Sequence, residues 1–95
     1  MIGRLFGKVV AQDGDTIVVD VGGVGYELLV PIGTVGRAVA DASGAQTFHV
    51  HTHVREDALL LFGFATEPDR AAFRTLIGVS NVGPKTAIAV LSALP

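Results

Sequence analysis

Residues 59–64 read Leu-Leu-Leu-Phe-Gly-Phe, and this stretch decides how the chain is assembled. Alternate side chains of a β-strand point to opposite faces, so Leu60, Phe62 and Phe64 share one face and the two remaining leucines share the other. Both faces are apolar, and a strand of this kind must be covered on both sides. The stretch therefore predicts that one face of this strand packs into the core of the sheet and that the helical region that follows covers the other face.

Four segments upstream are rich in β-branched residues and are separated by turn-forming residues, which is typical of strands. They are Leu5 to Val10, Thr16 to Val21, Tyr26 to Val30 and Thr47 to Val54. An Asp-Gly pair within residues 11–15 predicts the first turn. Residues 31–40 are expected to form a loop with at most a short helix. Five strands with a long connection after the third predict a mixed β + α protein built on a five-stranded OB-fold Greek-key barrel.

The stretch Val21-Gly22-Gly23-Val24-Gly25 places three glycines in four positions. Glycine inside a strand pattern often marks a bulge or a tight bend. We therefore expect a bulged corner here, at which a strand changes direction within the barrel.

A helical region follows the last strand. Thr66 is a typical helix N-cap, with Asp69 three residues later at the capping-box position. The predicted helix ends near Gly78. Its apolar stripe comprises Ala72, Phe73, Leu76 and Ile77.

The second predicted helix, Pro84 to Leu94, is apolar on almost every side. Two helices alone cannot bury such a surface. We therefore expect this helix to be frayed, packed against the outer Leu59–Leu61 face of the barrel, or engaged with another copy. The chain, which ends at Pro95, is interpreted as the N-terminal fragment of a longer protein.

Between the two helices lies Asn81-Val82-Gly83-Pro84-Lys85-Thr86, which is predicted to be the hairpin of a helix-hairpin-helix unit. Proline suits the first helical position, and the glycine before it is expected to allow a sharp turn. The amides around Lys85 and Thr86 would then face outward at a helix N-terminus, where the peptide dipoles favour an anion. Val82 is expected to tuck between the helices. The six residues predict a grip on DNA phosphate without base readout; the alternative is an ordinary turn between packed helices.

Length and composition limit the classes of function. The 95 residues, 49% of them apolar, allow one domain or two very small ones. The lack of cysteine excludes disulfides and thiolate metal sites and favours a cytoplasmic protein, and no segment suits a signal peptide or a membrane span. A net charge of −2 counts against a broad basic DNA-binding surface. However, Arg70, Arg74 and Lys85 follow the last acid, Asp69, so the helical unit is predicted to be locally basic.

Motifs on both the barrel and the helical region follow one another in a recognisable order. They are Met1-Ile2-Gly3-Arg4-Leu5, then Val21-Gly22-Gly23-Val24-Gly25-Tyr26-Glu27, then Val54-Arg55-Glu56-Asp57-Ala58 with Leu61-Phe62-Gly63-Phe64, and finally Val82-Gly83-Pro84-Lys85. Over its whole length the chain resembles the RuvA family of bacterial Holliday-junction-binding proteins. One departure is visible, since the family usually has glycine where this chain has Asn81. Asparagine tolerates positive φ best after glycine, so the turn is expected to survive.

The resemblance implies a non-catalytic DNA-binding subunit with no cofactor and no metal. Residues 1–64 would be an OB barrel that forms homotetramers, with octamers as a further state, and residues 65–95 the first half of a double helix-hairpin-helix domain. Such proteins bind four-way Holliday junctions independently of sequence in recombination, DNA repair and the SOS response. They load the RuvB motor, which hydrolyses ATP for branch migration, through a C-terminal domain that this chain does not include. RuvC resolvase is a further implied partner.

Glu56 and Asp57 are adjacent carboxylates at a predicted tight turn. On sequence alone such a pair is usually a solvated loop tip. The resemblance instead implies an acidic pin: four copies around a four-fold axis would repel phosphates at the crossover and favour an open junction over plain duplex. Arg55 beside the pair is a candidate DNA contact or a charge that offsets it.

His49, His51 and His53 share one face of a predicted strand. A His-x-His-x-His stripe suggests a metal site, but an ordinary polar or interfacial strand face has the same pattern and is the favoured interpretation.

Two rival functions fit parts of the sequence. A DNA glycosylase with lyase activity would use Lys85 as a Schiff-base lysine, although such enzymes also need an aspartate and several helices further along the chain. A generic single-strand-binding OB module would need exposed aromatic side chains for stacking. This chain has no tryptophan and one tyrosine, and its phenylalanines mostly fall on core-facing positions.

Overall fold

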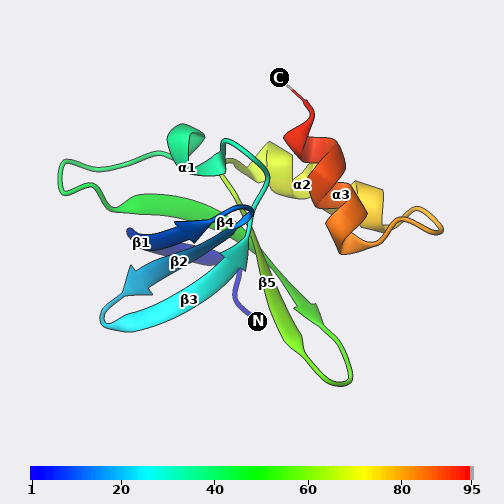
Figure 1. Ribbon diagram of the computed structural model, residues 1–95, viewed down its shortest axis with the longest axis horizontal. Coiled ribbons are helices and arrows are strands. Elements are labelled where there is room, and N and C mark those ends of the chain that lie inside the picture. The colour runs from blue at the N-terminus through cyan, green and yellow to red at the C-terminus, as the bar shows by residue number, and fades with distance from the viewer. Residues whose placement is uncertain (95) are drawn as a thin grey trace.

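A computed structural model describes residues 1–94, and it consists of a barrel with two helices packed on its outside (Figure 1). Pro95, the last residue of the second predicted domain, lies outside this range. The strands are β1 Arg4–Asp13, β2 Thr16–Val21, β3 Val24–Leu29, β4 Gln46–Val54 and β5 Leu59–Phe64. The helices are the short α1 Thr34–Arg37, then α2 Glu67–Ile77 and α3 Pro84–Ser92. The predicted strands and helices are thus confirmed, with shifts of a few residues at their ends.

The five strands close into a barrel in the order β1-β2-β3-β5-β4. All neighbouring pairs are antiparallel except β3 and β5, which pair in parallel with Leu29 opposite Phe62. Pairing of β1 with β4, with Leu5 opposite Phe48, closes the circle. This strand order is that of an OB-fold Greek-key barrel, so the predicted fold class is confirmed. Residues 30–45 form the long connection after the third strand and contain α1.

The glycine-rich stretch between β2 and β3 is a tight hairpin, and the bulged corner expected there is wrong. Val21 pairs with Val24, so Gly22 and Gly23 form a two-residue turn. Their φ angles of 59° and 92° are both positive, as the twist of a two-residue hairpin favours and as glycine alone adopts without strain. The register irregularity lies instead in β1, between Val9 and Ala11.

Strand β5 contributes to two apolar clusters, one on each of its faces. Leu61 lies in the barrel core with Ile17, Val19, Leu28, Phe48 and Val50. Phe62 and Phe64 face outward, and with Phe73 of α2 and Ala87 and Ile88 of α3 they form a second buried group, which we call the outer cluster. Both faces are therefore covered, as the sequence predicted.

Helix α3 packs on the barrel, but not on the Leu59–Leu61 face expected for it. Leu61 points inward and Leu59 is 60% exposed, so α3 covers the Leu60, Phe62 and Phe64 face instead. Ala87 and Ile88 are buried there, whereas Val90 and Leu94 remain exposed.

Polar contacts at the start of α2, and from α1 and the long connection, also hold the helices in place. The Asp69 amide donates to the Thr66 hydroxyl at 3.2 Å, which confirms the predicted N-cap of α2. The Asp69 carboxylate accepts from Arg37 at 2.7 Å, so it links α2 to α1. The amide of Ile32, in the long connection, donates to the Ser92 hydroxyl of α3 at 3.0 Å. Within residues 1–94 there is no helix long and apolar enough to cross a membrane.

Candidate nucleic-acid interface

The loop between α2 and α3 is a tight turn centred on Asn81. The Val82 amide donates to the Val79 carbonyl at 3.1 Å, and Asn81 takes a φ of 69°. Positive φ at the third residue of a turn favours glycine or asparagine, so Asn81 preserves the turn as predicted. Gly83 has a φ of −86°, which any residue adopts, and a Cβ added there would have no atom within 4 Å. The expectation that the turn needs Gly83 is therefore wrong.

Helix α3 begins without a side-chain cap. Gly83 is its N-cap residue and Pro84 its first helical residue, which has no amide hydrogen. The first amide bonded back into the helix is that of Ala87, which donates to the Gly83 carbonyl at 3.0 Å. Within the described part of the chain, the amides of Gly83, Lys85 and Thr86 donate to no acceptor. These three groups and the helix dipole form a concentrated positive end.

The residues predicted to bind phosphate therefore divide into two groups. Gly83, Lys85 and Thr86 are exposed and have amides available at the helix N-terminus. Val82 is half-buried and packs against the outer cluster, as predicted, while its amide is used within the turn. Val82 thus shapes the hairpin without offering its amide, and the exposed Asn81 shapes it through a positive φ.

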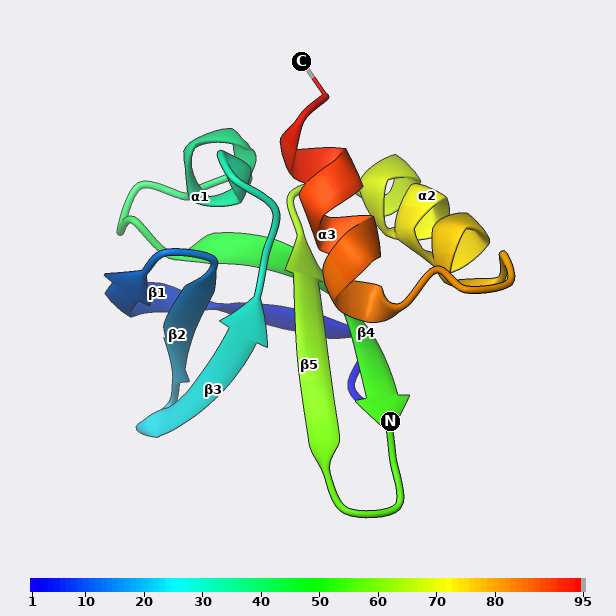
Figure 2. The ribbon, with the colours of Figure 1, turned by 45° about the vertical axis from the view of Figure 1, so that its right-hand side comes forward.

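The acidic pair lies at the tip of the β4–β5 hairpin. Arg55 and Ala58 exchange backbone hydrogen bonds of 2.8 and 3.4 Å, which leaves Glu56 and Asp57 as the two residues of the turn. All four are exposed. Figure 2 shows this hairpin extending beyond the barrel like a finger. Val54 and Leu59, the paired strand residues next to the turn, are 61% and 60% exposed, so this end of the hairpin lies outside the barrel.

The acidic tip and the start of α3 lie toward the same side of the molecule. In Figures 1 and 2, α3 begins at its end nearer the β4–β5 tip and runs away from it. A polyanion approaching from that side would meet attractive amides on the helix and repelling carboxylates on the finger. The two predicted sites therefore lie toward one side of the molecule, which we take as the candidate DNA-binding surface.

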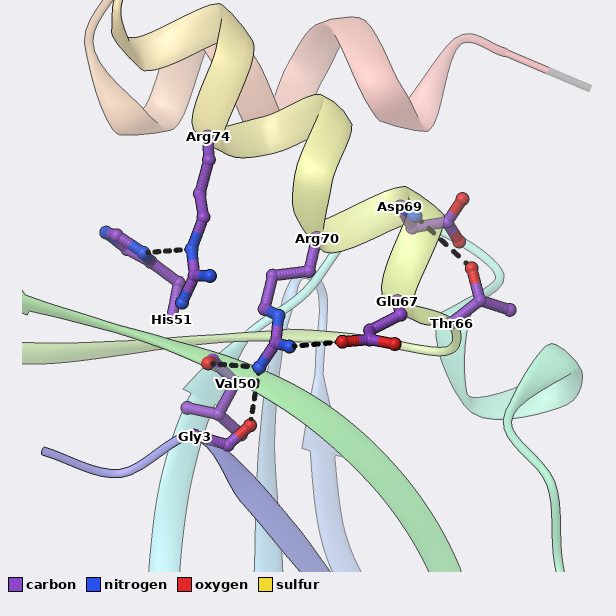
Figure 3. A network of polar contacts seen from close by, with 8 residues as sticks. All are labelled: Gly3, Val50, His51, Thr66, Glu67, Asp69, Arg70 and Arg74. Carbon is purple, nitrogen blue, oxygen red and sulfur yellow. Dashed lines mark hydrogen bonds and ion pairs between the residues drawn. The ribbon is translucent and has the colours of Figure 1, made fainter.

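Arg70 and Arg74 do not belong to that surface, because both bind the barrel. Figure 3 shows the Arg70 guanidinium between α2 and β4, where its Nη1 donates to the carbonyls of Gly3 at 2.7 Å and Val50 at 3.3 Å. Its Nη2 pairs with Glu67 at 3.1 Å. Arg74 Nε donates to His51 Nδ1 at 3.1 Å. Of the three cations predicted to make the helical unit basic, only Lys85 lies at the α3 N-terminus, and the other two lie where α2 faces β4.

The sequence analysis missed these arginine contacts, although a signal was present. Arg70 and Arg74 flank Phe73 on α2, at the spacing that places residues on one helix face. Two arginines at this spacing beside the buried Phe73 extend toward the strand on which the helix packs, where acceptors are within reach. The spacing therefore predicts acceptors on the facing strand, but not which ones.

The histidine stripe lies on the outer face of β4, as predicted. The His51 ring lies 5.4 Å from the Phe73 ring and the His53 ring 6.2 Å from the Phe62 ring, measured between centroids. Burial lowers the pKa of His51, and the neighbouring Arg74, His53 and Arg70 charges lower it further. No three His, Asp or Glu side chains among residues 1–94 are grouped to hold a metal ion.

Comparison with known proteins gives the family. Residues 1–63 match the family described as RuvA N terminal domain. A relative from Syntrophotalea carbinolica is 50% identical over 95 residues, which cover 100% of this chain and 47% of that protein. This chain belongs to the RuvA family. Its barrel is the OB fold of the RuvA N-terminal domain.

Further RuvA relatives match to a similar extent. One from Solidesulfovibrio magneticus is 56% identical over 93 residues, covering 97% of this chain and 46% of the relative. One from Rubrobacter xylanophilus is 50% identical over 94 residues, covering 99% and 47%. All three relatives are named Holliday junction branch migration complex subunit RuvA. The chain thus spans about half the length of the curated relatives it matches.

Proposed function

We propose that this chain binds four-way DNA junctions independently of sequence, as part of the non-catalytic subunit of a branch-migration complex in recombination and DNA repair. The observation that carries the proposal is the presence, on one side of a RuvA-family fold, of an uncapped helix N-terminus and an exposed pair of carboxylates. The first would attract DNA backbone and the second would repel it. A junction has arms to grip and an open centre to avoid, whereas plain duplex has no such centre.

The grip would act on phosphate. Amides of Gly83, Lys85 and Thr86 at the start of α3 supply donors, and the Lys85 ammonium adds a mobile charge. Neutral backbone donors bind any sequence equally, because phosphates carry no base identity. Residues 65–95 would thus act as one helix-hairpin-helix unit.

Selectivity would come from the acidic tip. Glu56 and Asp57 are exposed at the end of a finger, and no ion pair neutralises them within residues 1–94. Four copies around an axis would gather eight carboxylates at the crossover and keep the strands apart. Arg55 would steer a strand or offset part of this charge. The barrel, residues 1–64, would provide the contacts of such a homotetramer, and an octamer of two tetramers would be a further state.

The remaining partners follow from the family. The names of the relatives describe a branch migration complex, and an ATP-driven RuvB motor would supply its energy. In the longer protein a further domain would recruit that motor, RuvC resolvase would act on the same junction, and the complex would work in the cytoplasm, including during the SOS response.

The burial of the aromatic side chains disfavours base stacking. Phe48, Phe62, Phe64 and Phe73 are fully buried, and the fifth phenylalanine, Phe6, is 42% exposed. A single-strand-binding groove would need several exposed rings. Lys85 is exposed, whereas a Schiff-base lysine is activated by burial, so lyase chemistry is disfavoured as well.

Equilibrium titration of the chain with labelled four-way junction, duplex and single strand of equal nucleotide number tests the proposal. We expect the junction to bind most tightly and duplexes of unrelated sequence to bind alike. Equal affinity for junction and duplex would contradict the assignment. Tightest binding to single strand would favour an OB-fold stacking mode instead.

A further inference from the structure

The Arg70 side chain joins three separate parts of the molecule. It extends from α2 and donates to the Glu67 carboxylate one turn earlier and to the carbonyls of Gly3 and Val50 (Figure 3). Gly3 immediately precedes β1 and Val50 lies in the middle of β4. The Gly3 carbonyl also accepts the Val50 amide at 2.9 Å, so Arg70 binds the seam at which β1 and β4 meet.

We propose that Arg70 is a positioning residue that sets the angle between the α2–α3 pair and the β4–β5 finger, and thereby the junction selectivity of the chain. This inference rests on the proposed function, since it concerns the two parts of the same DNA-binding surface. Arg70 would act without touching DNA. Its side chain is 16% exposed and its guanidinium already has three acceptors.

The apolar contacts between the helices and the barrel cannot set this angle by themselves. Phe73 packs between Phe62 and Phe64, with ring centroids 5.0 Å from each. Burial of this kind holds two layers together but is not directional, so it constrains the angle between them less closely than hydrogen bonds do. A guanidinium is planar and rigid, and its hydrogen bonds are directional. Two carbonyl acceptors on the barrel therefore define one orientation of α2.

Val50 lies on β4, the strand that continues into the β4–β5 finger. A change in the orientation of α2 relative to β4 therefore changes the distance between α3 and the acidic tip. Glu56 lies six residues further along the same chain direction, which is about 20 Å at the rise of a β-strand. A change of about 10° in the angle between α2 and β4 would displace the acidic tip relative to α3 by about 3 Å over that length. The charges of one strand of duplex DNA follow one another about every 3.4 Å along the helix axis, a spacing similar to this displacement, so the attractive and repelling parts would lose register with the phosphates.

Two other polar contacts of α2 are less suited to this role. Arg74 donates one hydrogen bond to the His51 side chain of β4 at 3.1 Å, whereas Arg70 binds two backbone carbonyls of the barrel. Arg37 also joins α2, through Asp69 at 2.7 Å, but it extends from α1 and its side chain is 53% exposed. Within the described residues its side chain hydrogen-bonds to Asp69 and to no residue of β4, the strand that carries the finger. Arg37 therefore provides a matched control: an arginine of the same charge, bound to the same helix, at a place where the angle to the finger is not set.

A distance measurement tests the proposal without DNA. The chain has no cysteine, so Asp57→Cys and Thr86→Cys place one spin label on the exposed tip and one at the exposed start of α3. We expect a single narrow distance distribution for the parent. Arg70→Met should broaden or shift this distribution. Arg70→Lys should do so too, because an ammonium keeps the charge but lacks the planar arrangement of several donors that a guanidinium has. Arg37→Met should leave it unchanged. An unchanged distribution in both Arg70 variants would overturn the proposal.

DNA titrations of the unlabelled proteins supply the functional readout. The junction-to-duplex affinity ratio should fall about fivefold in Arg70→Met, a modest coupling between two parts of a site. The dependence of affinity on salt should stay as in the parent, since no phosphate contact is lost. A shallower salt dependence would make Arg70 a phosphate contact and overturn the inference, as would a lower melting temperature with an unchanged ratio. If the parent itself shows no junction preference, the proposed function fails, and the distance measurement still decides the role of Arg70.

Discussion

Arg74 Nε donates a hydrogen bond to Nδ1 of His51 at 3.1 Å, and this contact requires that nitrogen to be unprotonated. The His51 imidazole also lies 5.4 Å from the Phe73 ring, and the charges of Arg74 and Arg70 act on it. Protonation would place a cation beside Arg74 and would remove the acceptor. Helix α2 is therefore held to β4 by a contact that exists in only one protonation state.

The free energy of unfolding should consequently depend on pH through His51. The pKa of His51 is lowered by burial first and by the nearby charges second, while the unfolded chain keeps the ordinary value near 6.5. Above that value neither state binds the proton. As pH falls below it, the unfolded chain is protonated first, so stability is lost until the folded pKa is passed. Chemical denaturation at pH 7.5 and pH 5 should show this loss.

Two variants isolate the contribution of His51. His51→Asn retains an acceptor that does not titrate, so it should lose less stability than the parent between the two pH values. His49→Asn, on the same strand face, should lose as much as the parent. If all three proteins lose the same stability, the His51–Arg74 contact is not the source of the pH dependence.

Much of the fold was predictable because it depends on local patterns. The apolar residues on both faces of 59–64 required two layers, and both are present as the barrel core and the outer cluster. Thr66 and Pro84 marked the helix starts correctly because caps act within one turn. The glycine stretch was misjudged because glycine suits a bulge and a hairpin turn equally. Only the register of Val21 with Val24 distinguishes the two.

The site was less predictable, because its polar contacts join residues distant in sequence. Arg70 reaches Gly3, 67 positions away, and no local pattern reports such a pairing. The exposure of Glu56 and Asp57 followed from turn chemistry. The common side shared by the acidic tip and α3 depends on how the helices dock, which is a property of the whole fold.

Gly83 is a suitable position at which to test phosphate binding, because substitution there should not strain the backbone. Since its φ of −86° is ordinary and the space beside it is open, Gly83→Ala and Gly83→Val should fold with stability within about 1 kcal/mol of the parent. A side chain at this position would narrow the open space through which phosphate approaches the α3 N-terminus, so junction affinity should fall about tenfold, as expected for a lost hydrogen bond to a charged group. Calorimetry and junction titration measure the two quantities.

Asn81→Gly serves as the companion change. Glycine keeps the positive φ that Asn81 adopts and removes a side chain near the approach to the hairpin, so affinity should stay equal or rise slightly. Parental junction affinity in a folded Gly83→Val would show that phosphate does not approach α3 at this point.

Lys85 should contribute mainly through its charge. Because the backbone amides remain, Lys85→Ala should weaken junction binding only moderately, and the slope of log affinity against log salt should fall by about one unit per engaged subunit. Lys8→Ala, an exposed lysine on β1, removes the same charge elsewhere and should keep the parental slope. Equal slopes in all three proteins would place Lys85 outside the interface.

The acidic tip should control selectivity and not affinity in general. The double change Glu56→Gln with Asp57→Asn removes two exposed negative charges while it keeps the shape of the turn. Repulsion costs binding wherever phosphates approach the finger, and it costs most for a duplex lying across it. Affinity for duplex should therefore rise more than affinity for junction, so their ratio should narrow, most clearly at low salt, where screening is weak.

A charge-matched control separates this local effect from the net charge of the protein. Asp13→Asn with Glu27→Gln also removes two exposed carboxylates, from β1 and β3, and raises the net charge by the same amount. It should strengthen binding to both DNA forms alike and leave their ratio unchanged. If the tip variant merely behaves like this control across a range of salt, Glu56 and Asp57 form a solvated turn, and the discrimination of junction from duplex must arise from the geometry of the helices alone.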